Sequence, residues 1–254
     1  MRQLPYKAII VDFDRTLLHT DKSISAYTQQ VLREWRKAGA FLFAATARPE
    51  RAITEFCRIL DIRTVTTLNG ARTITPGGVF DFPVSAVSAE SVLDRLCSVS
   101  GTVISAEAES GIYANTDIPD WSPKVTDNIR GLPRQEKIYK ILASHPLIPA
   151  DEICPDLPED TYSTVADRKL LQVMSRNATK WNGVKQMLEA YKIAPEQAIY
   201  FGDDNDDMEP IRRCGCGVAV SNGLEHVRDA ADYVAGSNDE DGVAVFLDRL
   251  IRES

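Results

Sequence analysis

The stretch VDFDRTLL, residues 11–18, decides the fold of this chain. It continues an apolar run, residues 8–11, of the kind that forms a strand covered on both faces of a parallel sheet. Two aspartates, Asp12 and Asp14, stand where this strand is expected to end. Because ligands bind beyond the carboxyl ends of parallel strands, we expect both carboxylates to face a functional crevice.

Strand and helix patterns alternate through the first 70 residues. Apolar residues recur at three- and four-residue intervals from Ile24 to Ala38, which predicts an amphipathic helix. Residues 40–46 and 64–70 are expected strands, and a helix is expected between them from Pro49 to about Leu60. This order predicts the α/β class, with a doubly wound, mostly parallel Rossmann-like sheet.

The rhythm changes after about residue 81 and returns near residue 180. Between these points, a helical stretch at residues 86–98 and several strand-like segments give an α+β pattern with short connections. We therefore expect a core domain in two parts, residues 1–82 and 177–254, with an inserted α+β domain at residues 83–176.

Composition narrows the classes of function. The 254 residues carry a formal net charge of −8 and no block of Lys and Arg, so nucleic acid is not an expected partner. No apolar run is long enough to span a bilayer or to form a signal peptide, so we expect no membrane association and a cytoplasmic location. The five cysteines lack CxxC spacing, which predicts neither a disulfide framework nor a zinc site.

Further polar residues fall at the same expected edge of the sheet. Thr46 ends the second strand, Lys180 begins the helix after the inserted domain, and GDDNDD, residues 202–207, follows a late strand. Crowded carboxylates would have to protonate unless a cation neutralises them, and an all-oxygen site suits Mg²⁺. A metal-bound carboxylate opposite a lysine and a hydroxyl is what phosphoryl transfer requires.

The two aspartates at the end of the first strand can have different catalytic roles. One of them can attack phosphorus to form an aspartyl-phosphate. The other, two residues on, points the same way if the chain stays extended, and it can serve as general acid and base.

The ordered set DFDRT, ATARP, LNGA, NATKWNGV, GDDNDDMEP, GVAVSNG, AADYV and NDEDGVAVFL resembles the haloacid dehalogenase (HAD) superfamily. More closely, it resembles the Cof-type phosphatase branch, in which a large α/β cap is inserted after the third core strand. The matches run in order from residue 7 to about residue 250, and the unmatched middle falls where that branch carries its cap. The resemblance implies a Mg²⁺-dependent phosphohydrolase that cleaves a phosphomonoester of a small metabolite, such as a sugar phosphate, nucleotide or cofactor phosphate.

The resemblance also implies roles for individual residues. Asp12 would be the nucleophile and Asp14 the acid and base. Mg²⁺ would be held by the Asp12 carboxylate, the Asp14 carbonyl and Asp203. Asp207 would belong to the same metal site by holding the groups around these direct ligands.

The same resemblance implies a phosphate-binding set. Thr46 would hydrogen-bond the phosphoryl group, and Lys180 would bind it and steady Asp12. Ala47 and Asp206 are the other implied substrate-binding positions.

Three residues depart from the usual pattern of the branch. Arg15 and Ala47 stand where Gly is usual, and Arg15 is expected to be tolerated if its φ is negative, because it supplies no side chain to the chemistry. Asp206 stands where Asn is usual, and its carboxylate would repel an anionic substrate unless it is protonated or turned away. A reduced rate, an altered substrate and inactivity are the alternatives there.

Two other functions stay open at this point. A phosphomutase would pass the phosphoryl group of the aspartyl-phosphate to a second hydroxyl, and a non-catalytic protein would bind a phosphometabolite without turnover. The leaving group is expected to be recognised by the inserted domain, where the candidates are Glu107, Tyr113, Trp121 and Lys124. Both a monomer and a homodimer are compatible with the sequence.

Overall fold

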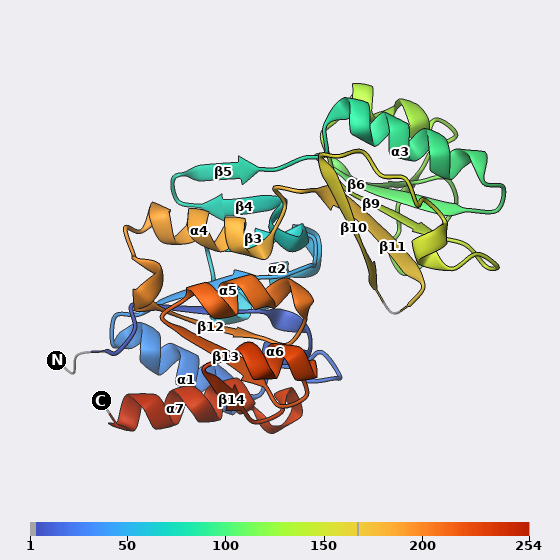
Figure 1. The fold of residues 1–254 in the computed structure, drawn as a ribbon. Helices are drawn as coiled ribbons and strands as arrows, with labels where there is room; N and C mark the ends of the chain where they lie inside the picture. The colour runs from blue at the N-terminus through green and yellow to red at the C-terminus, as the bar shows by residue number, and fades with distance from the viewer. Residues whose placement is uncertain (1–3, 167, 254) are drawn as a thin grey trace. The chain divides into compact units, whose positions relative to one another are not determined.

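The structure is a computed structural model and describes residues 4–166 and 168–253. It divides into two compact units, one formed by Met1–Phe80 with Thr179–Ser254 and the other by Asp81–Ala178 (Figure 1). The first unit holds a mostly parallel sheet with helices on both faces, and the second holds a mixed sheet with a helix on one face. The expected fold class is therefore confirmed.

The sheet of the first unit has the strand order β14-β13-β12-β1-β2-β3-β4-β5. The strands from β14 to β3 pair in parallel, whereas β4 pairs with β3 in the antiparallel sense. Their bounds are β1 Ala8–Val11, β2 Phe41–Ala45, β3 Val65–Thr67, β4 Arg72–Thr75, β5 Gly78–Asp81, β12 Ala198–Gly202, β13 Cys216–Val220 and β14 Tyr233–Ala235.

Two hydrophobic clusters cover the two faces of this sheet. Ile9 and Val11 of β1 pack in one cluster with α1, α2 and α7, while Ala8 and Ile10 pack in the other with α4, α5 and α6. The continuous apolar run at the start of the chain thus serves both faces, as its pattern predicts. The helices are α1 Ala26–Lys37, α2 Thr54–Leu60, α4 Lys180–Ala190, α5 Met208–Arg213, α6 Glu225–Ala230 and α7 Gly242–Glu253.

The second unit is built on a sheet of order β10-β11-β9-β6-β7-β8. Helix α3, Ala86–Ser98, is capped by Ser85, whose side chain accepts a hydrogen bond from the Ser88 N–H. The helix packs Val92, Leu93 and Leu96 into the core. All pairs in this sheet are antiparallel except that of β7 with β8. The strands are β6 Val103–Ala108, β7 Gly111–Ala114, β8 Lys124–Val125, β9 Ile138–Ser144, β10 Thr161–Ala166 and β11 Leu170–Ser175.

Two local expectations need correction. The strand expected over residues 64–70 ends at Thr67, because Asn69 (φ 58°) and Gly70 (φ 96°) adopt left-handed conformations that close a tight turn. After that turn the chain forms β4 and β5, which the alternation of strand and helix did not predict. The helices of residues 4–166 and 168–253 include none with the length and apolarity needed to cross a bilayer.

Candidate active site

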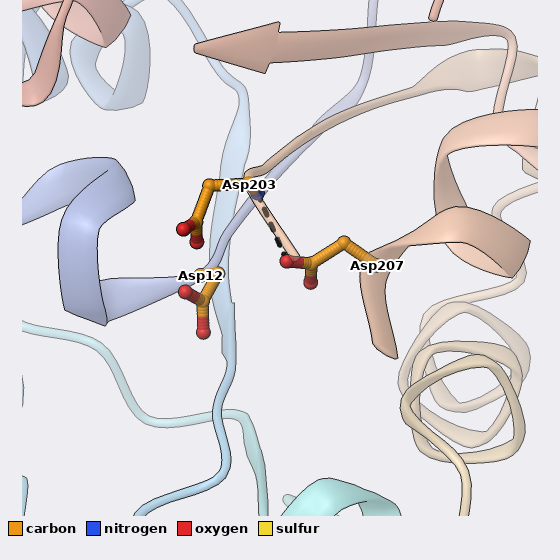
Figure 2. Close-up of side chains that lie close together, drawn as sticks. All are labelled: Asp12, Asp203 and Asp207. Carbon is orange, nitrogen blue, oxygen red and sulfur yellow. Dashed lines mark hydrogen bonds between the residues drawn. The ribbon is translucent and has the colours of Figure 1, made fainter. Parts of the chain in front are cut away.

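Three buried aspartates converge at the carboxyl edge of the parallel sheet. Asp12 follows β1 and Asp203 follows β12, and these strands are neighbours paired through Val11 and Phe201. Asp207 reaches the same point from the short helical turn Asn205–Asp207 (Figure 2). One carboxylate oxygen of each aspartate lies within 4.8 Å of the other two. The cluster therefore concentrates negative charge in a water-poor place.

Asp207 fixes the loop that carries Asp203. One of its oxygens accepts hydrogen bonds from the backbone N–H groups of Asp203 (3.0 Å) and Asp204 (3.1 Å). The other oxygen accepts from the Tyr200 hydroxyl (2.5 Å) and the Lys180 ammonium (2.7 Å). Gly202 makes this fold-back feasible, because an added Cβ there would lie only 2.4 Å from the Asp207 Cβ.

Lys180 is the buried cation of the cluster. It is the first residue of α4, is buried, and donates from Nζ to Asp12 Oδ1 (2.9 Å) as well as to Asp207. Burial alone would lower the pKa of this lysine, but the charges of Asp12 and Asp207 raise it above its ordinary value, so the ammonium stays protonated. The start of α4 is held close to the turn at Gly70, where a Cβ would meet the Thr179 carbonyl oxygen at 1.9 Å.

One lysine does not balance three carboxylates. Burial raises the pKa of Asp12 well above its ordinary value; Lys180 opposes this shift, whereas Asp207 and Asp203 add to it. Burial and the charge of Asp207 also raise the pKa of Asp203 to about 6. A hard divalent cation would hold these carboxylates ionised, and their oxygens are the donors that such an ion prefers. The donor set thus fits a metal site.

Asp14 lies in a different environment. Its side chain is 37% exposed and accepts two hydrogen bonds from Arg48, at 2.5 Å from Nε and 2.7 Å from Nη2. Lys22 Nζ donates to it as well, at 2.7 Å. Burial would raise the pKa of Asp14, but the hydrogen bonds from Arg48 and Lys22 outweigh this and lower it. Sequence analysis missed both cations as partners of Asp14, and Lys22 carries no local signal that would have revealed it.

Arg15 does not have the negative φ under which a residue other than Gly was expected to be tolerated at this position. Its φ is +59°, not negative, and Asn222 holds this backbone by donating from Nδ2 to the Arg15 carbonyl at 2.7 Å. The neighbouring Thr16 donates from its hydroxyl to Asp203 Oδ1 at 3.0 Å. The sequence pattern indicates no role for Thr16, and its place in DFDRT is the one available signal.

The implied phosphate-binding residues other than Lys180 follow the strands β2 and β12. Thr46 follows β2, the other neighbour of β1, and is buried, with its hydroxyl accepting from the Arg48 backbone N–H at 3.1 Å. Ala47, next to it, is exposed. Asp206 accepts a hydrogen bond from the side-chain amide of Asn69, and its charge contributes to the raised pKa of Lys180. The carboxylate that replaces the usual Asn is therefore tied to an amide donor near Lys180.

The candidates in the second unit lie on different elements: Glu107 on β6, Tyr113 on β7, Lys124 on β8 and Trp121 in a turn. Lys124 is exposed and lies 5.0 Å from the centre of the Tyr113 ring, and the Tyr113 hydroxyl donates to Glu136 at 2.6 Å. Glu107 is buried on β6, where it stands opposite Lys140 of β9. Trp121 lies in a turn, where its backbone N–H donates to the Ile118 carbonyl.

The core is Rossmann-like, with aspartates and a buried lysine at its strand ends, and a mixed sheet is inserted into it. This combination defines a class of phosphatases. Comparison with known proteins agrees with this assignment. The family model described as haloacid dehalogenase-like hydrolase matches residues 9–247, and the chain belongs to this family as a Cof-type phosphatase with a cap. The buried cluster of Asp12, Asp203 and Asp207 fits the metal site of that family.

Similar proteins cover nearly the whole chain. The 5-amino-6-(5-phospho-D-ribitylamino)uracil phosphatase YitU of Bacillus subtilis (strain 168) is 25% identical over 265 residues, which is 97% of this chain and 98% of that protein. The solved structure of the HAD phosphatase BT1666 from Bacteroides thetaiotaomicron has a TM-score of 0.84 at 20% identity, with 96% of this chain and 95% of that chain covered. The HAD subclass IIB sugar phosphatase BT4131 gives a TM-score of 0.80 at 22% identity, with 96% and 98% covered.

Proposed function

We propose that the protein is a Mg²⁺-dependent phosphatase that cleaves a phosphomonoester of a small metabolite through an aspartyl-phosphate on Asp12. The observation that carries this proposal is the contact of Lys180 with both Asp12 and Asp207, beside Asp203, at one buried strand edge. A buried carboxylate fixed by a lysine next to a metal-binding group is arranged to act as a nucleophile on phosphorus.

Asp12, Asp203 and the Asp14 carbonyl would hold the metal. Lys180 uses one carboxylate oxygen of Asp12 and Thr16 uses one of Asp203, so the second oxygen of each would serve as metal ligand. Both oxygens of Asp207 already accept hydrogen bonds from the protein, which suits it to support the site without binding the ion. When bound, Mg²⁺ would neutralise charge on the phosphoryl oxygens.

The proposed reaction has two halves. Asp12 attacks phosphorus, the bond from phosphorus to the leaving oxygen breaks, and Asp14 gives that oxygen a proton. In the second half the Asp14 carboxylate takes a proton from the water that attacks the aspartyl-phosphate, the bond from phosphorus to the Asp12 oxygen breaks, and phosphate leaves. This restores the Asp12 carboxylate and the protonated Asp14 that the first half requires. The hydrogen bonds from Arg48 and Lys22 lower the pKa of Asp14, which favours the ionised form used in the second half and opposes the protonated form used in the first.

Thr46, Ala47 and Lys180 would hold the phosphoryl group during both halves. Residues 83–176, the expected cap domain, would select the leaving group. The name of the relative YitU specifies a phosphorylated ribityl compound as its substrate, so a sugar or polyol phosphate is the first class to test here.

Hydrolysis of p-nitrophenyl phosphate and of a panel of sugar, polyol, nucleotide and cofactor phosphates tests the proposal. We expect phosphate release with Mg²⁺, none with EDTA, and a loss of at least about 1000-fold in Asp12→Asn. Asp94→Asn, an exposed aspartate of the second unit, is the matched control and should keep full activity. Release that persists in Asp12→Asn or in EDTA contradicts the proposal.

Asp206 favours one second candidate, a phosphometabolite-binding protein without turnover. Its carboxylate, close enough to raise the pKa of Lys180, adds negative charge where the phosphate would bind. Tight binding of a phosphorylated ligand by calorimetry, with no hydrolysis across the panel, would select this candidate.

A further inference from the structure

Arg15 is held in place by contacts at both its backbone and its side chain. Its φ of +59° is a conformation that residues with a side chain rarely adopt. Asn222 donates to the Arg15 carbonyl at 2.7 Å, and the Arg15 guanidinium donates from Nη2 to the Asn222 carbonyl at 3.1 Å. Asn222 is itself fixed, because its side-chain oxygen accepts from the Asn238 N–H at 2.9 Å. These contacts give the guanidinium a defined position.

That position is beside the carboxylate of Asp203. Arg15 Nε lies 3.7 Å from Asp203 Oδ2, while Thr16 donates to the other oxygen, Oδ1. The Arg15 side chain is 60% exposed and that of Asp203 is 7% exposed, so the guanidinium stands at the solvent side of a buried acid. An arginine keeps its charge at every pH at which proteins fold. Asp203 Oδ2, the oxygen expected to bind metal, therefore faces a permanent positive charge.

We propose that Arg15 is a built-in counter-ion that competes with the divalent metal for Asp203 and thereby weakens metal binding. This inference rests on the metal dependence in the proposed function. A monovalent and a divalent cation a few Å apart repel each other even when water screens them, and the repulsion corresponds to about a tenfold change in metal affinity. The same guanidinium partly compensates the carboxylate cluster when no metal is bound.

Three substitutions separate charge from backbone strain. Arg15→Met removes the charge but keeps a side chain at positive φ, and Arg15→Lys keeps the charge. Arg15→Gly removes both the charge and the strain, because Gly adopts positive φ readily. Asp203→Asn serves as the control that removes a proposed metal ligand.

The experiment is a calorimetric titration of each folded variant with MgCl₂, repeated at low and at high ionic strength. We expect Arg15→Met and Arg15→Gly to bind Mg²⁺ about tenfold more tightly than wild type and Arg15→Lys to match wild type. The difference should shrink at high ionic strength, because the guanidinium is exposed and salt screens it.

The contrary outcomes are distinct. Equal affinities of wild type and Arg15→Met, with binding lost in Asp203→Asn, would overturn the inference alone. Tighter binding in Arg15→Gly only would also overturn it, since the backbone and not the charge would then be responsible. Absence of Mg²⁺ binding in wild type and in Arg15→Met would overturn it together with the metal dependence of the proposed function.

Discussion

Asp12 and Asp14 are separated by one residue and lie in opposite electrostatic environments. Asp12 is buried among other carboxylates with a raised pKa, whereas Asp14 is partly exposed, paired with Arg48 and Lys22, and has a lowered pKa. The separation arises because the strand ends at Val11 and the chain then enters the irregular turn Phe13–Leu17, in which Asp14 has an extended backbone and Arg15 has a φ of +59°. The two side chains therefore do not continue a strand alternation. A short motif can thus supply two carboxylates with different chemistry when the backbone turns between them.

The largest effect is expected when Lys180, the buried cation that contacts Asp12, is removed. Lys180→Met leaves Asp12 and Asp207 buried without their shared ammonium, which is expected to cost about 3–5 kcal/mol of unfolding free energy. The same change should lower phosphatase activity at least about 100-fold. Urea denaturation and p-nitrophenyl phosphate hydrolysis measure the two effects.

Lys185→Met, at an exposed position on the same helix, is the matched control for Lys180→Met. It should be close to neutral in both assays. A stable and active Lys180→Met protein would show that the carboxylates do not depend on this lysine.

The pH dependence of stability tests the carboxylates themselves. Asp203 has a pKa of about 6 in the folded state against an ordinary value of 3.8, so between these pH values the folded state binds a proton that the unfolded state releases. In EDTA the titration of Asp203 should therefore lower the melting temperature of wild type by about 5 °C, relative to that of Asp203→Asn, as pH rises from about 4 to about 6.

Added Mg²⁺ should reverse this trend, because metal ligands must be deprotonated. We expect a larger Mg²⁺-induced rise in melting temperature at pH 7.5 than at pH 5. A rise of equal size at both pH values would argue against metal binding by these carboxylates.

Asp206→Asn sharpens the comparison by removing one carboxylate near Lys180. Less negative charge at the phosphate site should lower KM for a phosphomonoester about threefold to tenfold, with a smaller change in kcat. Steady-state kinetics measures both constants, and Asp229→Asn on α6 is an exposed control. An increase in KM would indicate that the Asn69–Asp206 hydrogen bond supports the site.

The smallest expected effect is that of Arg48→Met, which removes a hydrogen-bond partner of Asp14. Arg48→Met removes two hydrogen bonds that lower the pKa of Asp14, so this pKa should rise toward its ordinary value. The limb of the pH–rate profile that depends on ionised Asp14 should then move to higher pH. Arg58→Met, an exposed arginine of α2, should leave the profile unchanged. An unchanged profile in Arg48→Met would exclude Asp14 as the titrating group.

Sequence analysis predicted the strands that carry Asp12 and Asp203 because their apolar runs are local patterns. It also placed Lys180 at a helix start, where the structure has it. It missed Tyr200 as a partner of Asp207, since a tyrosine inside an apolar strand looks like an ordinary core residue. It missed β4 and β5 because the sheet was predicted from alternating strands and helices, and β4 follows β3 directly as an antiparallel strand.

The sequence by itself determined the order of the helices and strands and the acids and lysine at their ends. Hydrophobic periodicity is a property of consecutive residues, so it can be recognised without the tertiary structure. Only the tertiary structure decided which polar groups meet. Thr16 and Asp203 are 187 positions apart, Lys180 and Asp12 are 168 apart, and Arg15 is tied to Asn222 at a separation of 207. Such contacts depend on strand order and loop conformation, including the positive φ of Arg15, and no local pattern encodes them.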